Sequence, residues 1–145
     1  MNPKAYLMQI QKLDAKIKQR QQQLDELTAT MYGLSGGSLG ERVSTSAKNE
    51  AAFVQLVERK EALEFFLTSL MVEFMDKKNR IIGEIQSMDN ENYMNLLYKR
   101  YVEGKRLELI AVEMNYNYGH IKKMHGLALL AFDKQFLKDA TQCNL

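Results

Sequence analysis

Few side chains in this sequence have the type and spacing that catalysis or metal binding needs. His120 and His125 are the two histidines, and they lie five residues apart instead of the four that puts two ligands on one helical face. Cys143, the single cysteine, has no histidine placed to activate it. Paired carboxylates such as Glu61 and Glu64 fit solvated positions on an amphipathic helix. We therefore expect no metal, no cofactor and no enzymatic activity.

Two adjacent lysines suit another chemistry, the binding of phosphate. In a helical projection at about 100° per residue, Lys122 and Lys123 fall opposite Ile121, on a face shared with two glycines. A basic face with little bulk suits close approach to a nucleic-acid backbone, although a lysine pair can also belong to an ordinary solvated face. The DNA-binding residues predicted here are Asn117, Tyr118, Gly119, His120, Lys122, Lys123 and Gly126.

The elements that would position this face follow a helix-turn-helix pattern. A helix is predicted over 107–114, Asn115 takes a turn where asparagine tolerates a left-handed conformation, and Asn117 caps a helix reaching to about 138. Ala111 lets the second helix approach, and the predicted small core comprises Ile110, Met114, Tyr116, Ile121 and Met124. In such a motif the second helix lies in the major groove with its first residues at base edges.

A third helix is predicted before this pair, over 93–102, with Gly104 at its end and its cap among residues 89–92. The basic excess also sits here, because the chain from Asn92 onward holds eight Lys/Arg and five Asp/Glu. Three leucines on the second helix of the motif, Leu127, Leu130 and Leu137, share an outer side. We expect them to pack on a partner or on the preceding helices.

The first part of the chain carries two long heptad patterns. Apolar residues between Tyr6 and Met31 recur at gaps of three and four, which predicts a helix over 4–31, and a second pattern predicts a helix over 50–88. Arg20 interrupts the first seam, where it can either snorkel out or set the register. The Gly- and Ser-rich segment 33–46 predicts a mobile loop. The predicted fold is all-α, with an antiparallel coiled-coil hairpin over 1–88 and a helix-turn-helix unit over 89–145.

The most apolar run in the chain, residues 65–75, indicates assembly. It is too short for a membrane span, which needs about 20 apolar residues, and it is apolar nearly all round. One neighbouring helix cannot cover that girth, so the remaining apolar surface should either drive oligomerisation or pack on the C-terminal unit, and we expect a homo-oligomer formed through the hairpin. The start of the chain lacks the apolar core of a signal peptide, and a cytoplasmic protein is expected.

Two resemblances extend this interpretation. The segment 97–104 (LYKRYVEG), followed by Leu107-Glu108-x-Ile110-Ala111, resembles the promoter-binding region four of bacterial primary sigma factors. The whole chain is similar to a family of small phage and prophage proteins of Gram-positive bacteria, described as sigma-like or ArpU-type transcriptional regulators. The matching segments are 6–14 (YLMQIQKLD), 40–46 (GERVSTS) and 100–129. Gly119 departs from the sigma pattern, which has a longer polar side chain at that position.

Two functions from different classes remain after these observations. The resemblance implies a sequence-specific regulator of phage or prophage genes in a bacterial host, with double-stranded DNA as partner and bacterial RNA polymerase as a further candidate partner. The alternative is a structural or adaptor protein, such as a small-terminase-like packaging component, that uses the coiled coil for assembly. Arg42, in the GERV segment, fits either a solvated loop charge or a functional residue.

Overall fold

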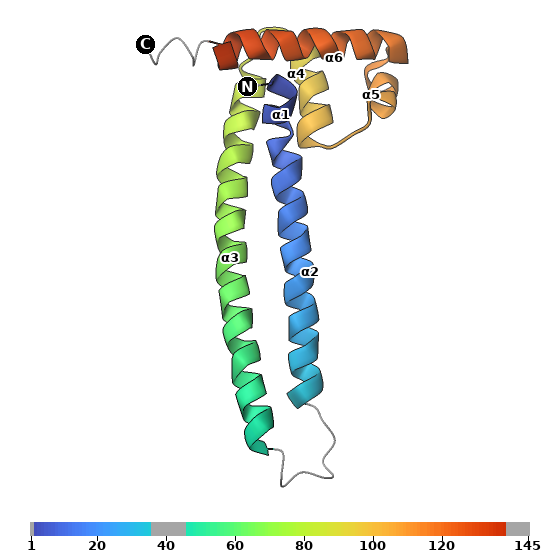
Figure 1. Ribbon diagram of the computed structural model, residues 1–145. Helices are drawn as coiled ribbons and strands as arrows, with labels where there is room; N and C mark the ends of the chain where they lie inside the picture. The colour runs from blue at the N-terminus through green and yellow to red at the C-terminus, as the bar shows by residue number, and fades with distance from the viewer. Residues whose placement is uncertain (1, 36–45, 139–145) are drawn as a thin grey trace, which may run out of the picture. The chain divides into compact units, whose positions relative to one another are not determined.

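The chain folds into helices throughout its described part. The computed structural model describes residues 2–35 and 46–138, and every regular element within them is helical, which confirms the all-α class. Figure 1 labels the six α-helices, and two further elements, η1 and η2, are π-helical turns. In chain order the elements are α1 (Pro3–Leu7), α2 (Gln9–Ser35), α3 (Ser46–Gln86), α4 (Glu91–Leu97), η1 (Tyr98–Val102), α5 (Leu107–Met114), α6 (Tyr118–Phe132) and η2 (Asp133–Leu137).

Asparagine side chains set the start of several helices. Asn2 Oδ1 accepts a hydrogen bond from the Lys4 backbone at 2.9 Å, with Pro3 at the first helical position. Asn90 Oδ1 accepts from the Asn92 backbone at 3.0 Å at the start of α4. Each bond satisfies an N–H that the first helical turn leaves without a partner. Asn90 lies among residues 89–92, so the cap predicted there is confirmed.

The predicted loop at 33–46 is too wide at both ends. Helix α2 continues through Gly33 to Ser35, and α3 begins at Ser46. The helical hydrogen bonds extend a turn beyond the last seam residue, since glycine costs a helix only about 1 kcal/mol relative to alanine. Residues 36–45, with Arg42, and residues 139–145, with Cys143, lie outside the described part of the chain.

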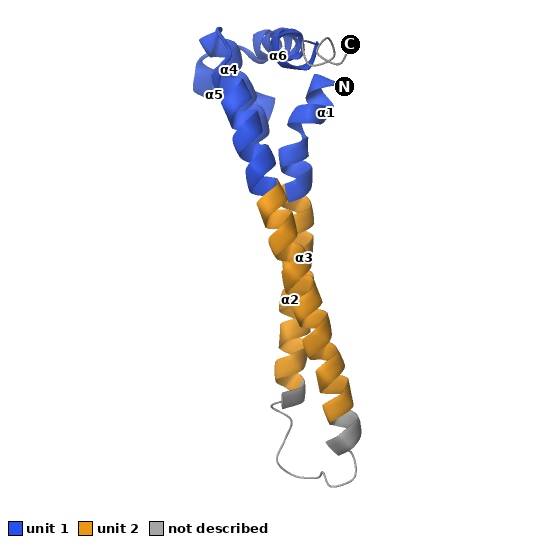
Figure 2. Cartoon of the chain, turned by 90° about the vertical axis from the view of Figure 1, so that its left-hand side faces the viewer, with its two compact units in different colours: residues 1–13, 74–145 blue, residues 14–73 orange. Residues whose placement is uncertain are grey.

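The contacts divide the chain into two compact units. Unit 1 comprises residues 1–13 and 74–145, and unit 2 comprises residues 14–73 (Figure 2). The domain boundary predicted after residue 88 therefore falls inside unit 1. The reason is a shared core, because the start of the chain and the end of α3 pack with the helices that follow them.

Unit 1 holds two apolar clusters. In the larger cluster, Leu7 of α1 and Ile85 of α3 pack together with Leu97, Tyr101 and Phe132, and all five are buried. The smaller cluster joins α4, α5 and α6 through buried side chains. Its members are Leu96, Ile110, Ala111, Ile121 and Met124, with Tyr93, Leu107 and Met114 packed against them. Helix α6 belongs to both clusters, so its orientation is fixed along its length.

Unit 2 contains α2 from Asp14 to its end and α3 from its start to Glu73, and these two helices run antiparallel (Figure 2). Leu67 and Leu70 of α3 are buried, as the heptad pattern predicts. Arg20 of α2 is exposed, and its guanidinium lies 5.0 Å from the centre of the Phe66 ring. The other sides of the predicted apolar belt stay open, because Phe65 is 76% exposed within this chain.

Candidate nucleic-acid interface

The turn between α5 and α6 is built on a left-handed asparagine. Asn115 has φ 59° and ψ 40°, the conformation predicted from its residue type. The turn is closed by two backbone bonds to the end of α5, in which Tyr116 N–H donates to Ala111 O at 3.0 Å and Asn115 N–H donates to Val112 O at 3.3 Å. These bonds satisfy carbonyls at the helix end and fix where the chain leaves α5.

Asn117 starts α6 two residues later. Its side chain accepts a hydrogen bond from the His120 backbone N–H at 2.7 Å. Behind this cap, Ile121, Met124, Ala128 and Phe132 are buried, and this confirms the predicted apolar side of the helix. The small Ala111 of α5 lies in the same cluster as Ile121 and Met124, which allows the two helices to pack closely.

All seven predicted DNA-binding residues are exposed at the start and outer side of α6. Their positions are Asn117, Tyr118, Gly119, His120, Lys122, Lys123 and Gly126. Helix α6 contains no Asp or Glu, so its lysines meet no acidic neighbour within the helix. The structure thus brings the predicted residues together on one surface.

Aromatic contacts order the first turn of α6. The Lys122 ammonium lies 4.2 Å from the centre of the Tyr118 ring, a cation–π distance. The rings of Tyr116 and His120 meet at a tilt of 36°, with their centres 4.8 Å apart. The prediction that Tyr116 belongs to the small core is wrong. Tyr116 falls outside both helices, in the exposed turn, where its ring packs on His120.

The three leucines expected to be covered behave differently from one another. Leu137 packs against the larger apolar cluster of unit 1. Leu127 and Leu130 of α6 remain 53% and 64% exposed. Within the described chain, therefore, Leu137 alone fulfils the expectation of packing on the preceding helices, and the other two lie on the same open side of α6 as Lys123.

His125 lies on the inner side of α6, away from His120. Its Nε2 shares a hydrogen bond of 2.8 Å with Tyr101 Oη, and the two rings stack at 5.8 Å. Burial, followed by the charges of Arg100 and Lys4, lowers the pKa of His125 below 6.5. Burial also raises the pKa of the Tyr101 hydroxyl. This pair joins the π-helical turn to α6. No sequence pattern indicates it, because 24 positions separate the two residues.

A network of ion pairs holds α5 against the turn that precedes it. Glu113 of α5 accepts hydrogen bonds from Lys99 and Lys105 at 3.0 and 2.9 Å, and Lys105 also pairs with Glu103 at 2.9 Å. These bonds lower the pKa of Glu113 and raise that of Lys105. Sequence reasoning missed this network, which depends on Gly104 turning the chain at φ 71°.

The same network separates two kinds of basic residue in unit 1. Lys99 and Lys105 are occupied by carboxylates, and Arg100 donates to the Lys105 carbonyl at 3.0 Å. Lys123 and Arg106, by contrast, form no ion pair with any described residue and are exposed. Lys123 of α6 and Arg106 at the start of α5 are therefore among the cations available for a phosphate.

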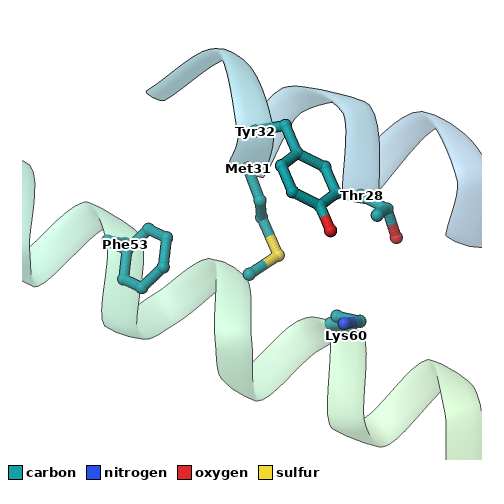
Figure 3. A pocket seen from close by; sticks show the side chains of 5 residues that line it. All are labelled: Thr28, Met31, Tyr32, Phe53 and Lys60. Carbon is teal, nitrogen blue, oxygen red and sulfur yellow. The ribbon is translucent and has the colours of Figure 1, made fainter. Parts of the chain in front are cut away.

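Unit 2 has a separate hollow of about 210 Å³, which is below the roughly 300–1,000 Å³ typical of small-molecule sites. It is lined by Thr28, Met31 and Tyr32 of α2 and by Phe53 and Lys60 of α3 (Figure 3). Lys60 lies 3.8 Å from Glu64 across one helical turn.

Residues 2–35 and 46–138 contain no group of three or more His, Cys, Asp or Glu arranged to hold a metal ion. None of the helices described combines the length and apolarity that crossing a bilayer requires.

Comparison with known proteins does not assign the chain to a family. No protein-family model, no curated protein and no solved structure matches the chain.

Proposed function

We propose that unit 1 binds double-stranded DNA through a helix-turn-helix formed by α5 and α6, and that the protein regulates phage or prophage transcription in the bacterial cytoplasm. Helix α6 is the recognition helix of this proposal. A long helical hairpin, formed by α2 and α3, supplies homo-oligomerisation. The role is one of binding and not of catalysis, and bacterial RNA polymerase is a further candidate partner.

The observation that carries the proposal is the contrast between the two sides of α6. One side is buried through Ile121 and Met124, whereas the other presents Lys122 and Lys123 without an acidic residue in the helix. Lysines and the backbone N–H groups at a helix start both favour phosphate. A surface of this kind is complementary in charge to the phosphate backbone of a DNA duplex.

The two glycines of this surface support the proposal independently. A Cβ at position 126 would meet nothing within 4 Å, and one at position 119 would meet Asn117 Oδ1 at an ordinary 3.5 Å. Packing within the chain therefore requires glycine at neither position, although each weakens a helix by roughly 0.5–1 kcal/mol relative to alanine. A partner that approaches the helix closely would explain their presence.

Specificity separates a regulator from an adaptor. The protein should bind one promoter fragment of the genome that encodes it about 10³-fold or more tightly than random duplex, when titrated at one fixed salt concentration. Replacing Tyr118 or His120 by alanine should reduce this preference, because both side chains lie where a recognition helix reaches base edges. Equal affinity for every fragment would favour the structural or adaptor function, with small-terminase-like packaging as its example.

A further inference from the structure

Helix α3 carries a second row of heptad-spaced positions within unit 2. The row comprises Val54, Glu58, Glu61, Phe65, Thr68 and Val72, at successive gaps of four, three, four, three and four, and we call it the ridge. In projection it lies about 140° from Leu67, the residue buried against α2. Every ridge residue is exposed, with Phe65 at 76% and Val72 at 58%. In the described part of the chain, no apolar partner covers the ridge.

A groove lies on another face of unit 2, where α2 and α3 meet. It has a volume of about 630 Å³ and is lined by residues of both helices. Leu27, Leu63 and Phe66 make its floor apolar, and Arg20 and Arg59 bring two positive charges to it. No acidic residue lines it, and Arg59 forms no ion pair with any residue in the described ranges.

The ridge and the groove are complementary in both charge and polarity. The ridge alternates apolar side chains with Glu58 and Glu61, neither of which has an ion-pair partner in the described part of the chain. Two ridges facing each other would bring four carboxylates into one seam that holds no basic residue, and two facing grooves would bring four guanidinium groups together. Juxtaposed like charges cost several kcal/mol, whereas pairing ridge with groove places opposite charges together.

We infer that the ridge of one copy of this chain packs into the groove of the next copy. Because one copy carries both surfaces on different faces, this contact is heterologous: it repeats from copy to copy and builds a ring or an open filament, not a closed pair. The inference rests on the homo-oligomerisation within the proposed function. Its tests contain no DNA, so their failure would leave the DNA-binding proposal in place.

Two complementary variants test the contact by sedimentation velocity at tens of micromolar. A ridge variant carries Glu61→Arg and Phe65→Arg, and a groove variant carries Arg59→Glu and Phe66→Glu. The side chains changed are exposed, so circular dichroism should show both variants folded. The wild-type chain should sediment as an assembly larger than a dimer. Each variant alone should sediment as a monomer, with its assembly weakened by about tenfold or more.

The equimolar mixture of these variants is the decisive sample. The ridge variant keeps an intact groove and the groove variant keeps an intact ridge, so the mixture should form a 1:1 dimer that grows no further. Several results would overturn the inference, because none gives this pattern. They are a wild-type chain that sediments as a monomer or stops at a ridge-to-ridge dimer, assembly by either variant alone, and assembly that requires a partner of other chemistry.

Charge and control variants complete the test. Mixing Glu58→Arg/Glu61→Arg with Arg20→Glu/Arg59→Glu should restore growth beyond a dimer, since each ridge then finds a groove of opposite charge. Met71→Arg makes an equivalent change at an exposed apolar residue that belongs to neither surface, and it should leave wild-type assembly intact. Loss of assembly in this control, or failure of the charge-swapped pair to assemble, would contradict the contact.

Discussion

The two units of this protein bury apolar residues to very different extents. Unit 1 closes a core in which Leu97, Ile85 and Phe132 have no exposed surface. Among the described residues of unit 2, the buried apolar ones are Leu67 and Leu70, while Phe65 and Phe66 of the same helix are exposed. This difference shows that similar heptad patterns can have two structural outcomes. One completes a core within the chain, and the other leaves a face that another copy can cover.

The largest effect on stability is expected when residues 89–145 are separated from the earlier residues that complete the core of unit 1. A fragment that starts at Asp89 lacks Leu7, Ile10, Ile81 and Ile85, all buried in the cluster that includes Phe132. Without them the fragment cannot cover the inner side of α6, and we expect no cooperative unfolding transition. Thermal unfolding followed by circular dichroism checks this. A sharp transition at the temperature of the full chain would show that residues 89–145 form a unit of their own.

The second-largest effect is expected from truncating single side chains, which compares the stability that each unit gains from its apolar residues. Ile85→Ala should lower the free energy of unfolding by about 2–5 kcal/mol, because it removes a fully buried side chain. Val72→Ala, at an exposed ridge position, should change the stability of the monomer by about 0.5 kcal/mol or less. Urea titration at a protein concentration low enough to keep the chain monomeric measures both. Similar losses for the two variants would remove the contrast between the units.

An intermediate effect is expected from pH, and it belongs to unit 1 alone. Burial and the charges of Arg100 and Lys4 hold the pKa of folded His125 below 6.5, so the unfolded chain takes up a proton first as the pH falls. The stability from neutral His125 is therefore present above about pH 6.5 and declines as the pH falls through the folded pKa. Urea titrations at pH 7.5 and 5.5 should show a drop that His125→Gln reduces. An unchanged drop in that variant would assign the pH dependence to other groups.

The smallest stability effect is expected at Gly126. Since nothing lies within 4 Å of a Cβ there, Gly126→Ala should stabilise the chain by roughly 0.5–1 kcal/mol. The same change should weaken DNA binding, because it adds bulk to the proposed contact surface. Gly83→Ala is the matched control, at an exposed helical glycine with equally open surroundings. It should gain similar stability without affecting DNA. Equal DNA affinity in both variants would argue against a close approach at Gly126.

The parts of the fold that depend on neighbouring residues could be predicted from the sequence. Helix α5 has the bounds 107–114 that were expected, Asn115 is left-handed, and Asn117 caps α6. The buried side of α6 follows from the spacing of Ile121 and Met124. Residue type and helical periodicity decide these features within a few positions along the chain.

The parts that depend on distant contacts could not be predicted. In the core of unit 1, Leu7 and Leu97 belong to one cluster, and next to the candidate site Tyr101 shares a hydrogen bond with His125. No local sequence pattern indicates either contact. Tyr116 was misassigned because an apolar ring in a turn can pack either on a core or, as here, on an exposed neighbour. The ion pairs of Glu113 likewise require the path that the chain takes at Gly104.

The most direct test of the central claim is the salt dependence of DNA binding after both lysines of α6 are removed. In Lys122→Ala/Lys123→Ala the buried side of α6 is unchanged, so circular dichroism should show a folded protein. Binding should weaken on every sequence, and the slope of log affinity against log salt should shrink by about two units if both lysines contact phosphates. Lys12→Ala/Lys18→Ala, which removes the same charge from exposed positions of α2, should keep the slope. A folded Lys122/Lys123 variant with full affinity and an unchanged slope would contradict DNA binding by this face and favour the adaptor function.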